Sequence, residues 1–332
     1  MPAPPAIPTT VPFGRTARRL GWAHVPPAVR AEVERRVGSP VVADATVTAG
    51  FTPGVATVLT FADGSRLFVK AAAAAAQRAF AAAYREEGRK LRALDGLVPA
   101  PRLRWSLDDA WVVLGIEHVP HRHPVRPWAD DELDRCLAVL AEVAATRLPD
   151  GPRLEPLADE VAAWPGHAAA LRDGRPDLAD RPVLEELAAL AARLPAVATG
   201  DALVHGDVRD DNLLLADDGR VLLCDWNWPS RGPAWVDPLV TLVGPAGDGV
   251  DVEAVVARTP ALAGADPEEL DVFLAALAAY FLVSGDLPVP PSSPWIRAFQ
   301  RWQGEAVLRW LSQRRGWDVP GLTDLGGVAR RW

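Results

Sequence analysis

The chain has 332 residues, of which 49% are hydrophobic and 23% are charged, proportions typical of a globular protein with a substantial core. Its two cysteines and six histidines form no CxxC pair and no cluster at metal-ligand spacing, which argues against a disulfide scaffold and a structural zinc site. The N-terminus lacks the apolar core of a signal peptide, and the longest apolar run is too short to span a bilayer, so we expect a soluble, cytoplasmic protein.

The formal net charge of −8 is unevenly distributed along the chain. Residues 1–117 carry 15 Arg and Lys against 10 Asp and Glu, whereas residues 118–332 carry 20 against 33, a difference of −13. This acidic second part would repel nucleic acid and anionic membranes, and it would attract a cationic small molecule. Solvated helix faces would account for most of these carboxylates without any ligand.

The first part of the chain alternates helical and β-rich patterns. Residues 27–37 are expected to form a helix, and two β-rich runs, 55–61 and 66–70, flank a turn sequence and predict a hairpin. An alanine-rich helix over about 72–94 follows, and residues 110–119 have the composition of another strand. This stretch therefore predicts a small, mainly antiparallel sheet with one helix packed on it.

From about residue 120 onward, helical apolar spacing dominates. The pattern predicts helices over 129–148, 183–194 and 293–315, the last with Ser293 as its N-terminal cap. One small β unit interrupts this helical region. Its predicted strands are 202–204, 212–215 and 221–225.

The polar loop of this β unit reads VHGDVRDDN and begins at Val204. The hairpin after the loop would return Asp225 to the neighbourhood of Asn212, and therefore of Asp207. Asn and Asp supply hard oxygen ligands suited to Mg²⁺, which uses few protein ligands together with phosphate oxygens. A separate aspartate could accept a hydroxyl proton, so the three side chains together indicate phosphoryl transfer.

The loop and the later CDW sequence resemble the catalytic and metal motifs of the aminoglycoside phosphotransferase-like family, whose members are relatives of the protein kinases. The resemblance implies that Asp207 is the catalytic aspartate beside the acceptor hydroxyl. It also implies that Asn212 and Asp225 hold Mg²⁺ on the nucleotide phosphates. Arg209 would steady the transferring phosphoryl group, and His205 would support the loop through hydrogen bonds.

Kinases of this kind pair a lysine on a strand of the small lobe with a glutamate on the following helix. Lys70 closes the second strand of the predicted hairpin and is one of only two lysines in a chain with 33 arginines, which suggests that a point charge is needed there. Glu87 precedes Leu91 and Leu94 by four and seven residues, so it shares their inward helix face. Glu86 is the alternative partner.

Two further segments match the nucleotide site of this family. Gly50, Phe51 and Gly54 stand in the sequence AGFTPGVA, where the family has its phosphate-covering loop, and the glycines would let backbone amides approach the phosphates. The sequence VVLGIEHVP resembles the hinge between lobes, where backbone groups near Glu117 and Val119 would face adenine.

The resemblance covers roughly residues 40–240 and implies an α+β, bilobal, protein-kinase-like fold. A nucleotide-binding N-lobe with a small antiparallel sheet and the hinge would span 40–119, and a mostly helical C-lobe with the catalytic loop and the acceptor site would span 120–332. Residues 1–39 form an N-terminal extension without an assigned role. Downstream of the motif, Asp237 matches a family segment whose aspartate supports the catalytic loop.

The sequence therefore predicts a kinase that uses ATP or GTP with Mg²⁺ and phosphorylates a hydroxyl of a small molecule, such as an aminoglycoside or another antibiotic. We expect neither nucleic acid nor a membrane as partner. The same family also phosphorylates macrolides, choline, homoserine and sugars, so the acceptor stays open. The alternative is a nucleotide-binding pseudokinase or regulatory module without phosphotransfer, which a turnover measurement would distinguish.

Overall fold

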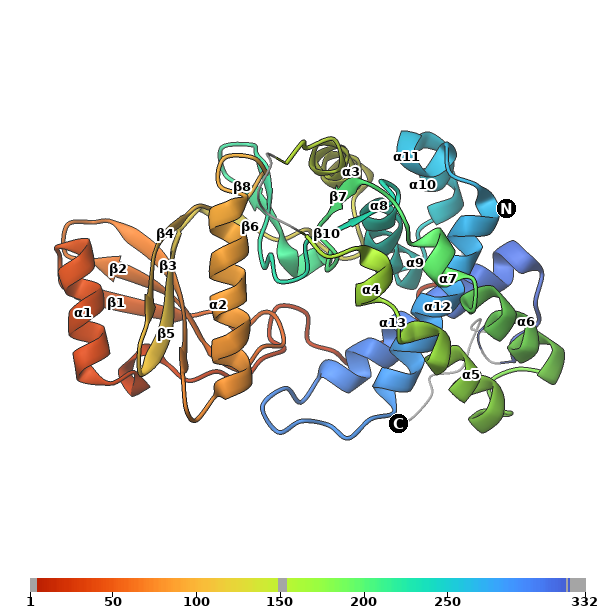
Figure 1. Ribbon diagram of the computed structural model, residues 1–332, viewed down its shortest axis with the longest axis horizontal. Helices are drawn as coiled ribbons and strands as arrows, with labels where there is room; N and C mark the ends of the chain where they lie inside the picture. The colour runs from red at the N-terminus through yellow and green to blue at the C-terminus, as the bar shows by residue number, and fades with distance from the viewer. Residues whose placement is uncertain (1–4, 149–153, 321, 323–332) are drawn as a thin grey trace.

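The computed structural model describes residues 5–148, 154–320 and 322. An antiparallel sheet of five strands occupies the first part of the chain, and helices dominate the second part (Figure 1). The strands lie in the order β1-β2-β3-β5-β4. Their bounds are β1 (Val41–Thr46), β2 (Val55–Phe61), β3 (Arg66–Ala73), β4 (Leu103–Asp108) and β5 (Trp111–Glu117).

Helices α1 (Pro27–Val37) and α2 (Arg78–Ala93) cover opposite faces of this sheet (Figure 1). Successive side chains of a strand point to opposite faces. Val69 of β3 therefore packs in a buried cluster with Val33 of α1, whereas the next residue, Lys70, reaches α2. This alternation places the predicted lysine on the face that looks toward the helical part of the molecule.

The alanine-rich segment after Lys70 does not become helical where its composition predicts. Strand β3 continues to Ala73, which pairs with Trp111 of β5, and Ala71 and Ala72 are fully buried. Tertiary pairing here outweighs the high helix propensity of alanine. Helix α2 consequently begins at Arg78 instead of near residue 72.

The second part of the chain combines two small sheets with many helices. One sheet has the order β6-β8-β9 and the other pairs β10 with β7. These strands are β6 (His121–Arg122), β7 (Ala202–Val204), β8 (Leu213–Ala216), β9 (Val221–Leu223) and β10 (Ser230–Gly232). The helices up to β7 are α3 (Asp130–Ala144), α4 (Leu157–Glu160), α5 (Trp164–Gly174), α6 (Arg181–Ala191) and α7 (Leu194–Val197). Those after β10 are α8 (Val236–Thr241), α9 (Val243–Gly247), α10 (Val252–Arg258), α11 (Pro260–Ala263), α12 (Pro267–Gly285) and α13 (Ile296–Arg315).

Helices α12 and α13 form the centre of the helical part. Most residues of α12 are buried, and no helix in the described part of the chain is long and apolar enough to cross a membrane. Helix α13 begins at Ile296, three residues after the predicted start. Ser293 does not cap it, because its N–H donates to Pro290 in a preceding turn and its buried hydroxyl has no partner among the described residues.

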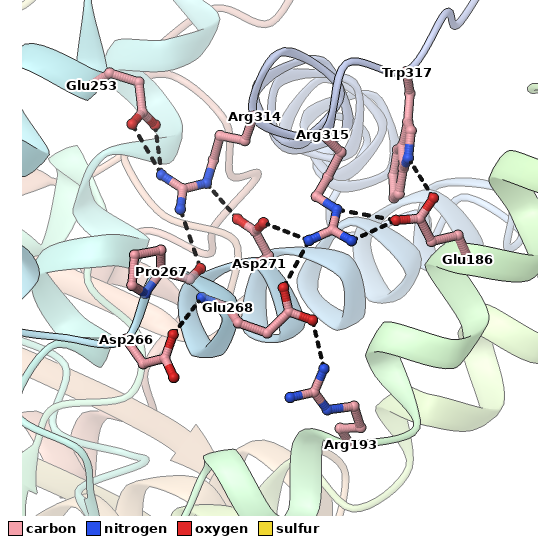
Figure 2. A network of polar contacts seen from close by, with 10 residues as sticks. All are labelled: Glu186, Arg193, Glu253, Asp266, Pro267, Glu268, Asp271, Arg314, Arg315 and Trp317. Carbon is pink, nitrogen blue, oxygen red and sulfur yellow. Dashed lines mark hydrogen bonds and ion pairs between the residues drawn. The ribbon is translucent and has the colours of Figure 1, made fainter.

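A polar network fixes the C-terminal end of α13 to three other helices (Figure 2). Asp271 of α12 is 5% exposed and accepts hydrogen bonds from both Arg314 and Arg315 of α13. The two arginines also pair with carboxylates of α10, α12 and α6, namely Glu253 at 2.9 Å, Glu268 at 2.7 Å and Glu186 at 2.6 Å. Because the buried carboxylate faces two cations, its charge is compensated inside the core.

The segment before α1 spans both parts of the molecule. Ile7 is buried in the main core, and its N–H donates to the Gly247 carbonyl of α9 at 2.7 Å. Ten residues later, the N–H of Ala17 donates to the Thr48 carbonyl, next to the sheet, at 2.9 Å. We call residues 5–19 the N-terminal strap.

Candidate active site

A pocket lies between the five-stranded sheet and the small β6-β8-β9 sheet. Side chains of both contribute to its walls, including Val58, Phe68 and Ile116 from one side and Leu214 and Cys224 from the other. Apolar walls of this kind suit the flat faces of a nucleobase. Charged groups gather at one end of the pocket.

Lys70 connects three elements at the charged end. Its Nζ lies 2.6 Å from Glu87 Oε1 on α2 and 3.0 Å from Asp225 Oδ1, just after β9. The side chains of Lys70 and Glu87 are only 11% and 1% exposed. Burial opposes the charge on Lys70, but the two carboxylates outweigh it and raise the pKa of the ammonium. Burial also opposes the charge on Glu87. It raises the pKa of this carboxyl group to about 7, although the nearby Lys70 charge acts to lower it.

The neighbouring Glu86 does not take part in this site. Its carboxylate lies 2.5 Å from Arg89 and 3.5 Å from Lys90 on the same helix, and its side chain is 44% exposed. The helical periodicity of α2 thus turns Glu87, and not Glu86, toward Lys70. Of the two glutamates that the sequence left open, the structure pairs Glu87 with the lysine.

The loop of residues 205–212, here called the catalytic loop, is fixed at its start by hydrogen bonds to Asp237. The two carboxylate oxygens of Asp237 accept the backbone N–H groups of His205 at 2.6 Å and Gly206 at 3.1 Å. His205 is fully buried, and its Nε2 lies 3.0 Å from the Cys224 carbonyl. These contacts couple the catalytic loop to the strand that leads to Asp225.

Asp207 is fixed by its own loop. The side-chain amide of Asn212 donates to the Asp207 carbonyl at 2.8 Å and to its Oδ2 at 3.3 Å. Arg209 Nη1 lies 2.6 Å from the same Oδ2. Burial raises the pKa of Asp207 to about 6, although the Arg209 charge acts in the opposite direction. A carboxylate with such a pKa is a stronger base than an exposed aspartate and is still ionised at neutral pH.

Arg209 lies between two carboxylates. Besides Asp207, its guanidinium contacts Asp211, with Nε 2.9 Å from Oδ1. The ring of Phe51 lies 5.7 Å away. The side chain is therefore fixed within the catalytic loop, and it lies near Phe51 of the phosphate loop (residues 49–56), the other segment that the sequence assigns to phosphoryl transfer.

The residues expected to hold a cation fit that task chemically. Lys70 and Asn227 both donate to Oδ1 of Asp225, and no described residue donates to its Oδ2. Burial opposes ionisation of Asp225, but Lys70 and Arg209 outweigh it and lower its pKa to about 2. The amide nitrogen of Asn212 is engaged by Asp207, which leaves its oxygen for a ligand. Among the described residues no group of three His, Cys, Asp or Glu could hold a metal by itself, so phosphate and water oxygens would complete the shell.

The predicted phosphate loop lies only partly against the pocket. Gly50 and Phe51 line it, and Phe51 stacks on Phe299 of α13 with ring centroids 5.0 Å apart. Gly54, which the sequence also assigned to the nucleotide, is not among the lining residues. A Cβ at Gly54 would lie 2.3 Å from the Tyr84 hydroxyl, so close packing on α2 explains this glycine.

The hinge residues Glu117 and Val119 both line the opposite end of the pocket. Two of their backbone groups already have partners. The N–H of Glu117 donates to the Arg102 carbonyl at 2.8 Å, and the Val119 carbonyl lies 2.6 Å from His121 Nδ1. The hinge residues and Lys70 thus line different parts of the pocket, since Glu117 pairs with Leu67 on β3, three residues before Lys70.

Two charged lining residues were not singled out from the sequence. Asp211 precedes Asn212 and holds Arg209. Arg19 comes from the N-terminal strap and also lines the pocket. Asp211 lies within the recognised motif and could have been found there. No local signal marks Arg19, because it precedes the segment that resembles known kinases.

Several solved structures have a fold similar to that of this chain. Solved structures with a similar fold include choline kinase LicA from Streptococcus pneumoniae (TM-score 0.55, 12% identity, 85% of this chain and 97% of that chain). They also include the AMP-bound spectinomycin phosphotransferase APH(9)-Ia (TM-score 0.55, 13% identity, 85% of this chain and 97% of that chain). A third is macrolide 2′-phosphotransferase MphH from Brachybacterium faecium (TM-score 0.51, 16% identity, 85% of this chain and 96% of that chain). These likenesses confirm the bilobal, kinase-like α+β fold.

No curated protein matches the sequence. The model of the phosphotransferase enzyme family matches residues 54–273, a segment that contains Lys70, Glu87, the catalytic loop and Asp225. More than half of the chain is matched, and the predicted resemblance is confirmed. The chain belongs to the phosphotransferase enzyme family.

Proposed function

We propose that this protein is a small-molecule kinase that transfers the γ-phosphate of ATP or GTP to a hydroxyl group, with Mg²⁺ as the divalent cation. The observation that carries the proposal is the convergence at one end of the pocket. Lys70 links Glu87 to Asp225, and the catalytic loop holds Asp207 beside Asn212. Membership of the family and the AMP bound to a neighbour of similar fold support a nucleotide in the pocket.

In this proposal each side chain has a separate task. Lys70, oriented by Glu87, binds the α- and β-phosphates of the nucleotide. Asn212 and Asp225 hold the cation, which when bound neutralises phosphate charge. Asp207 accepts the hydroxyl proton while the hydroxyl oxygen bonds to the γ-phosphorus and the bond from the γ-phosphorus to the bridging oxygen breaks, giving the phosphate ester and the nucleoside diphosphate. Arg209 neutralises charge on the transferring group.

The surroundings of Asp207 favour an acceptor that is cationic and partly apolar. Tyr280 lies in the electrostatic field of Asp207 and Arg209, and burial raises its pKa. Its ring stacks on Trp164 of α5, with centroids 4.8 Å apart. Trp228 is 54% exposed and its backbone adjoins Gly206 of the catalytic loop. Aromatic rings attract organic cations, and the net charge of −13 on residues 118–332 acts in the same direction.

The experiment is a transfer assay with γ-labelled ATP and GTP, with and without Mg²⁺, across matched acceptors. The panel pairs cationic alcohols, such as aminoglycosides, amino-sugar macrolides and choline, with neutral sugars and nucleosides. We expect Mg²⁺-dependent transfer to a cationic acceptor, and about 10³-fold slower transfer with the Asp207→Asn variant. Transfer to neutral acceptors alone would contradict the cationic preference but not the kinase.

The same assay separates the enzyme from a pseudokinase. If wild-type protein binds Mg·ATP but transfers phosphate neither to any acceptor nor to water, the nucleotide-binding alternative is favoured and the kinase proposal fails.

A further inference from the structure

The N-terminal strap lies against the phosphate loop of the nucleotide pocket. The Thr16 hydroxyl donates to the Gly50 carbonyl at 2.7 Å, and the N–H of Ala17 donates to Thr48 at 2.9 Å. The strap thus hydrogen-bonds to the backbone around the start of the loop through one hydroxyl and one backbone N–H. It brings Arg19 to the charged end of the pocket.

The guanidinium of Arg19 is only partly satisfied by the protein. Its Nη2 donates to the Ala49 carbonyl at 2.7 Å. Its Nε is buried and has no hydrogen-bond partner among the described residues. An arginine carries five N–H donors, so several remain for a ligand in the pocket that this side chain lines.

Gly50 makes room for this side chain. Its φ is +84°, a conformation that favours glycine. A Cβ at this position would lie 3.0 Å from Arg19 Nη2. The left-handed backbone of Gly50 therefore favours a glycine here whether or not phosphates approach, and the absence of a Cβ lets Arg19 lie close to the loop.

The charges around Arg19 differ from those around the other cations of the site. Lys70 pairs with Glu87 and Asp225, and Arg209 pairs with Asp207 and Asp211. Arg19 forms no ion pair with any residue that the structure describes.

Burial lowers the pKa of Arg19 below its ordinary value, and the fields of Tyr84, Asp225 and Asp211 act against this effect. The guanidinium stays charged at neutral pH. A half-buried cation that has no ion-pair partner among the described residues is stabilised when an anion binds beside it in the pocket.

The position of Arg19 identifies which part of a nucleotide it would meet. Its electrostatic neighbours Asp225 and Asp211 lie at the charged end, whereas Glu117 and Val119 line the hinge end. Ala49, which holds the guanidinium, is the first residue of the phosphate loop. The polyphosphate, and not the base, would therefore lie beside Arg19.

We propose that Arg19 of the N-terminal strap binds the polyphosphate of the nucleotide, as a second cation beside Lys70. The inference rests on the proposed nucleotide site, since it assigns a further ligand to it. Two N–H groups on one edge of the guanidinium can bind phosphate oxygens in a bidentate manner. The strap would then contribute directly to nucleotide binding, and its attachment to α9 and α13 would couple the phosphate loop to the helical part.

The test is the affinity of wild-type protein and variants for Mg·ATP and for adenosine, measured by calorimetry without an acceptor. Hydrogen bonds to charged groups are worth about 1.5–3 kcal/mol, which corresponds to roughly a 10- to 100-fold change in Kd. We expect Arg19→Ala to weaken Mg·ATP binding by this factor and to leave adenosine binding unchanged. The matched control is Arg18→Ala, because Arg18 is exposed and adjacent. This control should change neither affinity.

Arg19→Gln separates charge from loop support, since an amide can still donate to Ala49. It should weaken Mg·ATP binding selectively, and Arg19→Lys should restore part of it. The proposal is overturned if Arg19→Ala leaves the Mg·ATP affinity unchanged, or if it lowers the ATP and adenosine affinities by the same factor. Should Arg19→Ala fail to fold, the same comparison is made with Arg19→Gln: its loss of affinity for Mg·ATP is compared with its loss of affinity for adenosine.

These outcomes are distinguishable from failure of the proposed function. If Mg·ATP binding depends on Arg19 but no acceptor is phosphorylated, the kinase proposal fails and the role of Arg19 stands. If the wild-type protein binds adenosine and ATP equally, the role of Arg19 fails whatever the transfer assay shows. If it binds neither, both proposals fail.

Discussion

Asp207 and Asp225 have the same side chain and opposite electrostatic surroundings. Burial dominates at Asp207 and raises its pKa to about 6, whereas at Asp225 Lys70 outweighs burial and lowers the pKa to about 2. One aspartate is thus adjusted to exchange a proton near neutral pH, and the other stays ionised as a ligand would. Such a separation of pKa values between neighbouring acids is the usual sign of divided acid–base tasks.

The raised pKa of Asp207 predicts the acidic limb of the pH profile. Below pH 6 the carboxyl group of Asp207 is mostly protonated, so it cannot take up the proton of the substrate hydroxyl. With an acceptor that does not titrate between pH 5 and 8, kcat/KM should therefore fall about tenfold per pH unit below about pH 6 and level off above it. A flat profile across this range would contradict the assignment of Asp207 as the base.

Glu87, with a pKa of about 7, is a second group that titrates in this range. The profile of Glu87→Gln serves as the control, because this variant removes that titration and keeps Asp207. The limb near pH 6 should persist in it.

The pairing of Lys70 with Glu87 predicts different effects for two adjacent glutamates. Glu87→Gln removes the buried carboxylate that orients the lysine, so Mg·ATP should bind about tenfold more weakly, the loss expected for a charged hydrogen bond. Glu86→Gln is the matched control, because its carboxylate is exposed and pairs with Arg89. Equal effects in titration calorimetry of the two variants would contradict this geometry.

At the scale of elements, α13 is tied to its neighbours by charge as well as by apolar packing. Asp271 on α12 accepts from Arg314 and Arg315 in a network that also reaches α6 and α10 (Figure 2). Without the Asp271 carboxylate, Arg314, whose side chain is 10% exposed, would keep only the half-exposed Glu253 as an ion-pair partner, and losing a buried partner costs more free energy than losing a surface one.

Asp271→Asn should therefore lower the free energy of unfolding by about 3 kcal/mol. Glu185→Ala is the control, because Glu185 forms an exposed i,i+4 pair with Arg181 on α6, and it should lower this free energy by about 0.5 kcal/mol at most. Urea denaturation followed by tryptophan fluorescence measures both. A change for Asp271→Asn as small as that of the control would mean that Glu253 alone compensates Arg314.

Elements with strong local signals could be predicted closely. Helix α1 has the predicted bounds, 27–37, because a proline starts it and Gly38 in the left-handed conformation ends it. The alanines at 71–73 could not be assigned, because their helix propensity is local whereas their pairing with β5 is made by residues some forty positions away. Helix α13 begins at Ile296 since Ser293 is engaged in a turn that sequence spacing does not reveal.

At the scale of the whole molecule, the sequence order of motifs predicted which residues meet. Lys70, Glu87 and Asp225 are far apart in the chain and converge at one end of the pocket, as the resemblance implied. The contribution of the strap could not be predicted in this way. Residues 5–19 carry no motif, and their contacts with Gly247 and Thr48 arise only when both parts of the molecule are folded.

The assignment of Asp207 as the catalytic base is best tested by comparing wild-type protein with Asp207→Asn in both phosphate transfer and nucleotide binding. Asn keeps the size of the side chain but cannot accept the hydroxyl proton. We predict that single-turnover transfer of the γ-phosphate falls by about 10³-fold, while the Kd for Mg·ATP stays the same because Lys70, Asn212 and Asp225 are unchanged. Undiminished transfer by Asp207→Asn would contradict this assignment, because the reaction would then use a different base or a different site.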